Sequence, residues 1–127
     1  MSGWAATELD TIAGRDELTV ASRRNDSSLT RPRIVWVSCV GDEVFVRSVN
    51  GPDAAWYRST RVRHAGHISC GEVDKDVTFD DVSEDTRLNA DVDAAYRAKY
   101  RHYARSIVDS ICSAQARNTT LKLVPGG

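Results

Sequence analysis

The sequence lacks the features by which several broad classes of protein are recognised. Its three cysteines, Cys39, Cys70 and Cys112, are odd in number and form no Cys-x-x-Cys pair, so a disulfide framework is not expected. No apolar run approaches the length of a membrane span, and the first residues carry no basic-then-apolar signal sequence. We therefore expect a cytoplasmic protein with reduced thiols and no membrane partner.

Net charge is almost absent as well. The chain has 17 lysines and arginines against 18 aspartates and glutamates, which leaves a net charge of -1. This balance gives no electrostatic reason to expect a nucleic-acid partner. The charges are unevenly placed, because residues 22–70 hold eight arginines and four acidic residues, whereas residues 71–93 hold nine acidic residues. A small basic face beside an acidic one fits a small anionic molecule better than a polymer.

What the sequence does contain is a series of predicted elements within 127 residues, a length that suits one domain over residues 1–127. Thr7 with Asp10, and later Asp53, are expected to cap the first two helices, and Ser113 a last helical turn. The longest helix is expected to break near Ala104, since a single straight one would exceed the size of the domain. Periodicity and turn residues predict helices near residues 7–13, 53–64 and 88–111, and strands near 17–24, 33–40, 44–49, 66–70, 73–79 and 119–124.

The order of these elements predicts the fold class. Two hairpins with a helix between them, and helices near both ends, indicate an α+β protein with an antiparallel sheet. The strand at residues 33–40 is apolar on both faces, which favours a central position with Trp36 in the core. A small barrel, half open and covered by the long helix, would leave few exposed strand edges.

The stretch at residues 47–63 concentrates groups suited to an anionic, planar ligand. Arginine forks bind phosphate or carboxylate in bidentate fashion, and tryptophan or tyrosine rings stack on flat molecules. Arg47 stands out because it lies between apolar residues of a predicted strand, where a charge requires a partner. The candidate ligand contacts of this stretch are Arg47, Ser48, Asn50, Trp56, Tyr57 and Arg58. The alternative is that its arginines form a solvated face paired with the acidic residues that follow.

Two further patterns are better explained by surface exposure and packing than by metal binding or catalysis. His64 and His67 have the spacing of a metal-binding pair, but a helix end separates them and no third ligand stands nearby, so no metal is expected. Tyr96, Tyr100 and Tyr103 recur at helical intervals and are expected to pack the long helix against the core. No Cys-His or Ser-His-Asp arrangement is supported, so catalytic residues stay unassigned.

Two resemblances follow from these residues. The run Val44-Phe45-Val46-Arg47-Ser48-Val49, then Ala55-Trp56-Tyr57-Arg58 and a glycine-centred hairpin, resembles the deazaflavin-dependent nitroreductase group. More broadly, the segments 17–24, 34–58, 63–79, 93–109 and 116–125 resemble a family of small bacterial proteins of unknown function. Together the resemblances imply an antiparallel split β-barrel of about six strands covered by helices. They also imply a homodimer related to FMN-binding oxidoreductases.

The nitroreductase group carries a Gly-Arg-x-Ser-Gly-x-x-Arg phosphate loop after its first strand. In this chain the equivalent region is Ser22 to Arg31, where Arg23 and Arg31 take the places of the arginines. Both glycines are missing, and with them the close approach of backbone N–H groups to phosphate. The resemblance thus adds Arg23 and Arg31 to the candidate cofactor contacts and leaves the cofactor open between flavin, deazaflavin and none.

Two hypotheses of different classes remain. The first is a homodimeric enzyme that holds a flavin, a deazaflavin or another small anionic or aromatic molecule, with the redox chemistry supplied by the cofactor. Without a cofactor, the same cleft would serve an isomerase or cyclase acting on a small metabolite. The second is a non-enzymatic dimeric module that binds a ligand.

Overall fold

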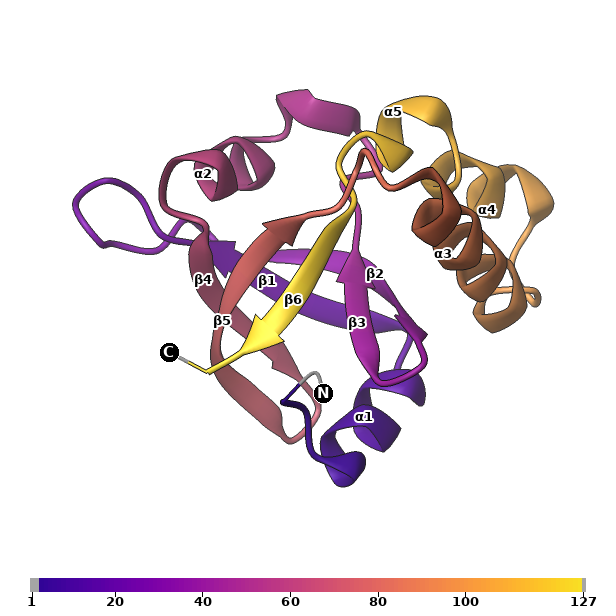
Figure 1. Cartoon of the computed structure of the whole chain (residues 1–127), viewed down its shortest axis with the longest axis horizontal. Coiled ribbons are helices and arrows are strands. Elements are labelled where there is room, and N and C mark those ends of the chain that lie inside the picture. The colour runs from indigo at the N-terminus through magenta and orange to yellow at the C-terminus, as the bar shows by residue number, and fades with distance from the viewer. Residues whose placement is uncertain (1–2, 127) are drawn as a thin grey trace.

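The computed structural model describes residues 3–126 of the chain (Figure 1). This part of the chain contains six strands, five α-helices and one short 3-10 helix, η1. In order the elements are α1 (Ala6–Ala13), β1 (Glu17–Ser22), β2 (Arg33–Val40), β3 (Glu43–Val46), η1 (Gly51–Asp53), α2 (Ala55–Arg63), β4 (Ala65–Cys70), β5 (Val73–Asp81), α3 (Thr86–Lys99), α4 (Arg105–Ile111), α5 (Ala114–Arg117) and β6 (Leu121–Pro125). The α+β class and the six antiparallel strands predicted from the sequence are confirmed.

The six strands form a closed barrel in the order β1-β2-β3-β6-β5-β4, and every neighbouring pair is antiparallel. The small barrel predicted from the sequence is confirmed, but it is closed and not half open. Leu123 of β6 pairs with Val44 on one side and Phe79 on the other, so the last strand fills the gap between β3 and β5. Pairing of β1 with β4, with Val20 opposite Ile68, closes the ring.

The apolar residues divide into two buried clusters. One fills the barrel and includes Leu18, Val20, Ile68 and Leu123, each at most 1% exposed. The other lies between the barrel wall and the helical side of the molecule, where residues of α3, α4 and β3 such as Phe45 pack together. Figure 1 shows α3, α4 and α5 gathered on one side of the barrel and α2 on another. This arrangement leaves the outer surface of β2 between two helical layers.

Several element ends differ from the sequence-based expectations. β3 stops at Val46, so Arg47 lies just beyond the strand and not within it. Asp53 belongs to η1, and Ala54 is the residue that precedes α2, without a side-chain cap. A left-handed Gly51, with φ of 83°, turns the chain here, and the Ser48 hydroxyl donates to its carbonyl. Because the turn and η1 occupy the residues between Val46 and Ala55, β3 ends earlier and α2 begins later than the sequence predicts.

Of the three helix caps predicted from the sequence, only the last is confirmed, because neither Thr7 nor Asp53 caps a helix. α1 begins one residue before Thr7, and the Glu8 side chain, in place of Asp10, accepts the Ala5 N–H at 3.0 Å. The predicted break in the long helix is confirmed, since α3 ends at Lys99 and Ala104 precedes α4. Ser113 caps α5 as expected, its hydroxyl accepting the N–H of Ala116.

Candidate functional site

A cleft of about 570 Å³ opens on the outer surface of β1 and β2, between the start of α2 and the helix α4. Its volume lies in the range of pockets that hold drug-sized ligands. The residues that line it come from five segments, two of which are joined by the turn at Gly51. They are Glu17, Arg33, Ile34, Val35, Trp36, Arg47, Ser48, Val49, Asn50, Ala54, Ala55, Trp56, Ile107 and Ile111.

Four of the eight predicted contact residues meet in this cleft, namely Arg47, Ser48, Asn50 and Trp56. Three of them follow β3 directly, and Trp56 sits in the first turn of α2. The turn at Gly51 folds these two short segments toward each other. Asn50 is exposed at the rim, whereas the Ser48 hydroxyl donates to the Gly51 carbonyl at 2.7 Å and so shapes the turn.

The other four predicted residues lie outside the lining of the cleft. Tyr57 is 1% exposed inside the barrel cluster, and Arg58 is exposed on α2. Arg31 is exposed before β2. Arg23 turns its guanidinium back to its own loop, where Nη1 donates to the Ser27 carbonyl at 2.8 Å. Contacts of these four with a cofactor stay a prediction, and the structure does not bring them to the cleft.

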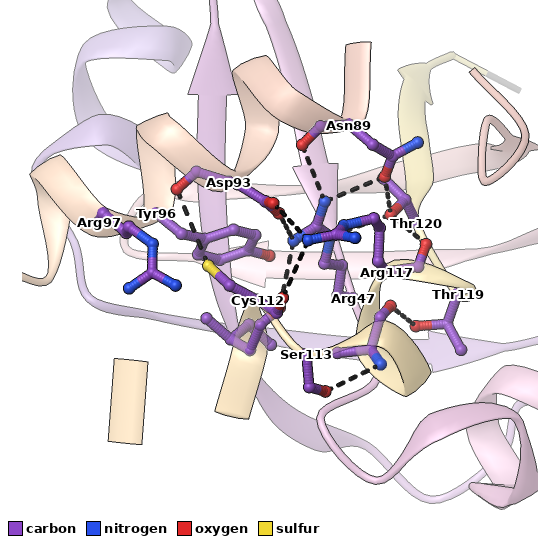
Figure 2. A network of polar contacts seen from close by, with 12 residues as sticks. Arg47, Asn89, Asp93, Tyr96, Arg97, Cys112, Ser113, Arg117, Thr119 and Thr120 are labelled. Carbon is purple, nitrogen blue, oxygen red and sulfur yellow. Dashed lines mark hydrogen bonds and ion pairs between the residues drawn. The ribbon is translucent and has the colours of Figure 1, made fainter. Parts of the chain in front are cut away.

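Arg47 is 1% exposed, and its guanidinium is fully engaged within the chain (Figure 2). Nε donates to the Thr120 hydroxyl at 2.9 Å. Nη1 donates to Asp93 Oδ1 at 2.5 Å and to the Ile111 carbonyl at 3.2 Å, and Nη2 donates to the carbonyl and the side-chain oxygen of Asn89. An arginine has five N–H donors, so none remains for a ligand while this network holds. The partner that the sequence predicts for Arg47 is therefore found within the protein itself.

Asp93 carries the negative charge of this network. Its second oxygen, Oδ2, accepts from Arg117 Nη2 at 2.8 Å, and its backbone carbonyl faces the thiol of Cys112 (Figure 2). Arg97, one turn further along α3, pairs with Asp109 of α4, its Nη1 donating to Oδ1 at 2.8 Å. The network ties α3, α4 and the segment before β6 to the end of β3. It therefore positions α4, one wall of the cleft.

Two tryptophans provide flat apolar surface in the cleft. Trp56 is 6% exposed, and its carbonyl accepts the Ser22 hydroxyl at 2.8 Å, which fixes α2 to β1. Trp36 is half-buried, which corrects the expectation that it is a core residue. The Trp36 ring stacks on the ring of Tyr100, with the ring centres 3.9 Å apart and the planes 2° from parallel. The strand β2 thus presents an aromatic side chain on its outer surface.

Ten of the lining residues were not among the predicted contacts, and they include Glu17, Arg33, Ile34, Ile107 and Ile111. A signal was present for Ile34, because a strand that is apolar on both faces needs a cover on its outer face as well. Ile34 is 65% exposed and Ile107 is 50% exposed, both unusually high for isoleucine. Glu17 and Arg33 gave no comparable signal, since isolated charges at strand ends are ordinary.

The cleft lining contains no histidine, cysteine, lysine or tyrosine. Glu17 is its one carboxylate, and Arg33 its one cation besides the engaged Arg47. Within residues 3–126, no group of three histidine, cysteine or acidic side chains is arranged to hold a metal ion. His67 lies on β4, where hydrogen bonds from its ring to the carboxylates of Asp76 and then Asp74 raise its pKa. The arrangement favours binding and orienting a flat molecule over acid–base or nucleophilic chemistry.

No helix in the described part of the chain is long and apolar enough to cross a bilayer. The fold itself is shared with solved proteins of low sequence identity. HutZ, the heme storage protein from Vibrio cholerae, is 16% identical with a TM-score of 0.70, over 96% of this chain and 90% of HutZ. A conserved hypothetical protein from Mycobacterium tuberculosis is 14% identical with a TM-score of 0.59, over 94% of this chain and 78% of that one.

A proposed 5-nitroimidazole antibiotic resistance protein from Bacteroides thetaiotaomicron is 13% identical with a TM-score of 0.57, over 97% of this chain and 81% of its own. At such identities the likeness concerns the fold alone. No curated protein sequence matches the chain. Residues 8–123 match a family of bacterial proteins, as expected from the segments that resembled one. The chain belongs to the family described as "Uncharacterized protein conserved in bacteria (DUF2255)".

Proposed function

We propose that this protein binds a flat, largely apolar organic molecule in the cleft, with a flavin or deazaflavin ring system as the ligand class. The observation that carries the proposal is the joint presence of Trp36, Trp56, Ile34 and Ile107 around one cleft of about 570 Å³. Trp36, Ile34 and Ile107 stay partly exposed in the free protein, and such side chains gain most from covering a planar ring, whereas Trp56 is buried and adds little exposed surface. The likeness in fold to a heme storage protein and to a proposed nitroimidazole resistance protein supports a small-molecule ligand.

The lining also favours one orientation of the ligand. Arg33 is exposed at the mouth of the cleft, and its guanidinium suits a phosphate or carboxylate at the end of the molecule. Arg47 would lie behind the ring of the ligand and would hold α4, one wall of the cleft, in place. A porphyrin is less favoured, because the cleft lining of one chain provides none of the histidine, cysteine, methionine or tyrosine ligands that heme iron takes.

Oxidoreductase activity is the enzymatic form of this proposal. The cleft offers Glu17 as its one carboxylate and lacks a histidine, lysine or thiol, so the redox chemistry would belong to the bound ring. A cofactor-free isomerase or cyclase would need general acids and bases, and the lining provides only Glu17, so this alternative is disfavoured. A binding protein without catalysis fits the lining equally well, and turnover of a reducible substrate by the loaded protein separates the two. The three free cysteines support our proposal of a cytoplasmic location.

Binding is tested by titrating the purified protein with FMN, with a deazaflavin and with heme, following ligand absorbance and tryptophan fluorescence. We expect a flavin-type ring to bind and Ile107→Glu to weaken it by about tenfold or more, which corresponds to roughly 1.4 kcal/mol. Val62→Glu is the matched control, because Val62 is 54% exposed on α2 outside the cleft. Absence of binding by both ring systems, or equal losses in the two variants, would contradict the proposal.

We further propose that two copies of the chain associate over the mouth of the cleft. Ile34, Val49 and Ile107, three of the five large apolar side chains exposed among the described residues, all line it. A second copy would bury this patch, as homodimer interfaces commonly do. Sedimentation is expected to show a dimer, and Ile34→Lys to weaken it by roughly 30-fold or more, the scale of an interface hot spot. A wild-type monomer, or a Val62→Lys control that dissociates as readily, would reject this interface.

A further inference from the structure

A second hollow of about 540 Å³ lies beside the cleft and shares Glu17 and Ile34 with it. Its lining is more polar and includes Asp16, Ser69 and Tyr103. The ridge between the two hollows is backed by aromatic rings. Trp36 lines the cleft and Tyr103 lines the second hollow, so this aromatic group spans the ridge.

The rings are in contact along the whole path. Trp36 lies 3.9 Å from Tyr100 in a parallel stack and 4.8 Å from Tyr103 at 52°, measured between ring centres. Tyr100 and Tyr103 are 5.8 Å apart, and Tyr96 extends the stack behind Tyr100 at 6.0 Å. At such separations an electron passes between rings without an intervening group.

The hydroxyl partners distinguish the three tyrosines. Tyr103 donates to the carboxylate of Asp16 at 2.9 Å, and this hydrogen bond raises the pKa of Tyr103. Tyr100 donates to the backbone carbonyls of Asp16 and Val37, and Tyr96 donates to that of Trp36. A carboxylate accepts a proton, whereas a carbonyl of the backbone does not. Tyr103 is therefore the ring of this group that loses an electron and its proton together.

We propose that Trp36 and Tyr103 form a one-electron relay from the cleft to the second hollow. Trp36 would give one electron to a one-electron oxidant held in the cleft, for which a flavin-type ring would serve. Tyr103 then returns one electron to Trp36, and its phenolic proton moves to Asp16 Oδ2. A small hydrophilic reductant in the second hollow restores Tyr103 by giving one electron, and Asp16 gives back the proton.

The charged groups around Asp16 are compatible with this proton transfer. His102 Nε2 lies 3.5 Å from Asp16 Oδ2, and its ring centre is 4.5 Å from that of Tyr103. Arg15 lines the same hollow. The Asp16 side chain is itself 39% exposed, so a proton taken up there can exchange with water. The physiological use of the relay rests on the ligand proposed above, but its electron transfer is a property of the protein alone.

The relay is tested on the protein without ligand, so that the result is independent of flavin binding. Azide radicals generated by pulse radiolysis oxidise tryptophan, and transient absorbance then follows the tryptophan radical and the tyrosyl radical. We expect decay of the former at a rate independent of protein concentration, with a matching rise of the latter. Tyr103→Phe should remove most of the tyrosyl rise and prolong the tryptophan radical. Trp36→Phe should lose the fast phase.

Two variants separate the relay from ordinary aromatic packing. Asp16→Asn leaves the rings in place but removes the proton acceptor, so the tyrosyl rise should slow and lose its solvent deuterium isotope effect. Tyr100→Phe keeps the stack and should retain a tyrosyl product. A tyrosyl yield unchanged in Tyr103→Phe, or a rise unaffected by Asp16→Asn, overturns the proposal. Circular dichroism and the Tm of each variant confirm that the comparison concerns folded protein.

Discussion

Replacement of Arg47 by alanine is expected to lower the free energy of unfolding by about 3–5 kcal/mol, the usual cost of removing one member of a buried ion pair. The side chain of Arg47 has no exposed surface, and that of Asp93 is 19% exposed. Alanine would leave the Asp93 carboxylate with Arg117 alone and would remove one donor each from the buried side-chain oxygens of Asn89 and Thr120. Urea denaturation followed by circular dichroism measures the loss.

Two matched variants show whether the charge or the network is responsible. Arg117→Ala removes the other cation on Asp93, but its side chain is 44% exposed, so the loss should stay within about 1 kcal/mol. Arg47→Lys keeps the charge and provides three donors in place of five, so its cost should fall between the two. A loss below about 1 kcal/mol in Arg47→Ala would mean that the network adds little to the folded state.

Arg47 also links stability to the candidate site. Its Nη1 holds the carbonyl of Ile111, the last residue of α4, and both Ile107 and Ile111 line the cleft. Loss of this contact would free the α4 wall, so ligand affinity should fall in Arg47→Lys even where the protein stays folded. The effect would differ from that of a direct ligand contact, because anionic and neutral forms of the same ring would be weakened alike.

Arg47 shows how much the sequence reveals about this site. A charge between Phe45, Val46 and Val49 requires a partner, as the sequence predicts. The partner is Asp93, which lies 46 positions later and belongs to a different element. A phosphate and an aspartate satisfy a guanidinium by the same hydrogen bonds, so the sequence alone could not distinguish a ligand from a distant carboxylate.

Some elements set by local chemistry were predicted well. β2 and the Ser113 cap depend on residues within a few positions of each other, and each lies where expected. The break near Ala104, which was expected from the size of the domain, is present as well. The position of Trp36 was not, because its exposure is decided by where Tyr100 of another element lies. The cleft combines five segments, and only the pair joined by the Gly51 turn was recognisable from neighbouring residues.

Substitution of Gly66 by alanine is the second change expected to have a large effect. Gly66 lies in β4 between Ser22 of β1 and Val77 of β5, at the seam where β1 and β4 close the barrel. An added Cβ would fall 2.2 Å from the Ala21 carbonyl oxygen and 2.7 Å from the Phe79 ring. Overpacking of a core costs about 1–3 kcal/mol, and a clash with backbone should reach the upper end of that range.

The two clashes at Gly66 make the prediction separable. Phe79→Leu would remove the ring from the clash, whereas the Ala21 carbonyl belongs to the backbone of β1, so Phe79→Leu should recover only part of the stability lost in Gly66→Ala. Gly14→Ala is the control, because its Cβ would approach the Asp10 carbonyl no closer than 3.3 Å and its φ is negative. Ser22 pairs with Gly66 and also holds the Trp56 carbonyl, so a shifted seam should weaken ligand binding in the cleft as well. Full recovery by Phe79→Leu in a double-mutant cycle would show that the ring, and not the closure of the barrel, is what requires glycine at this position.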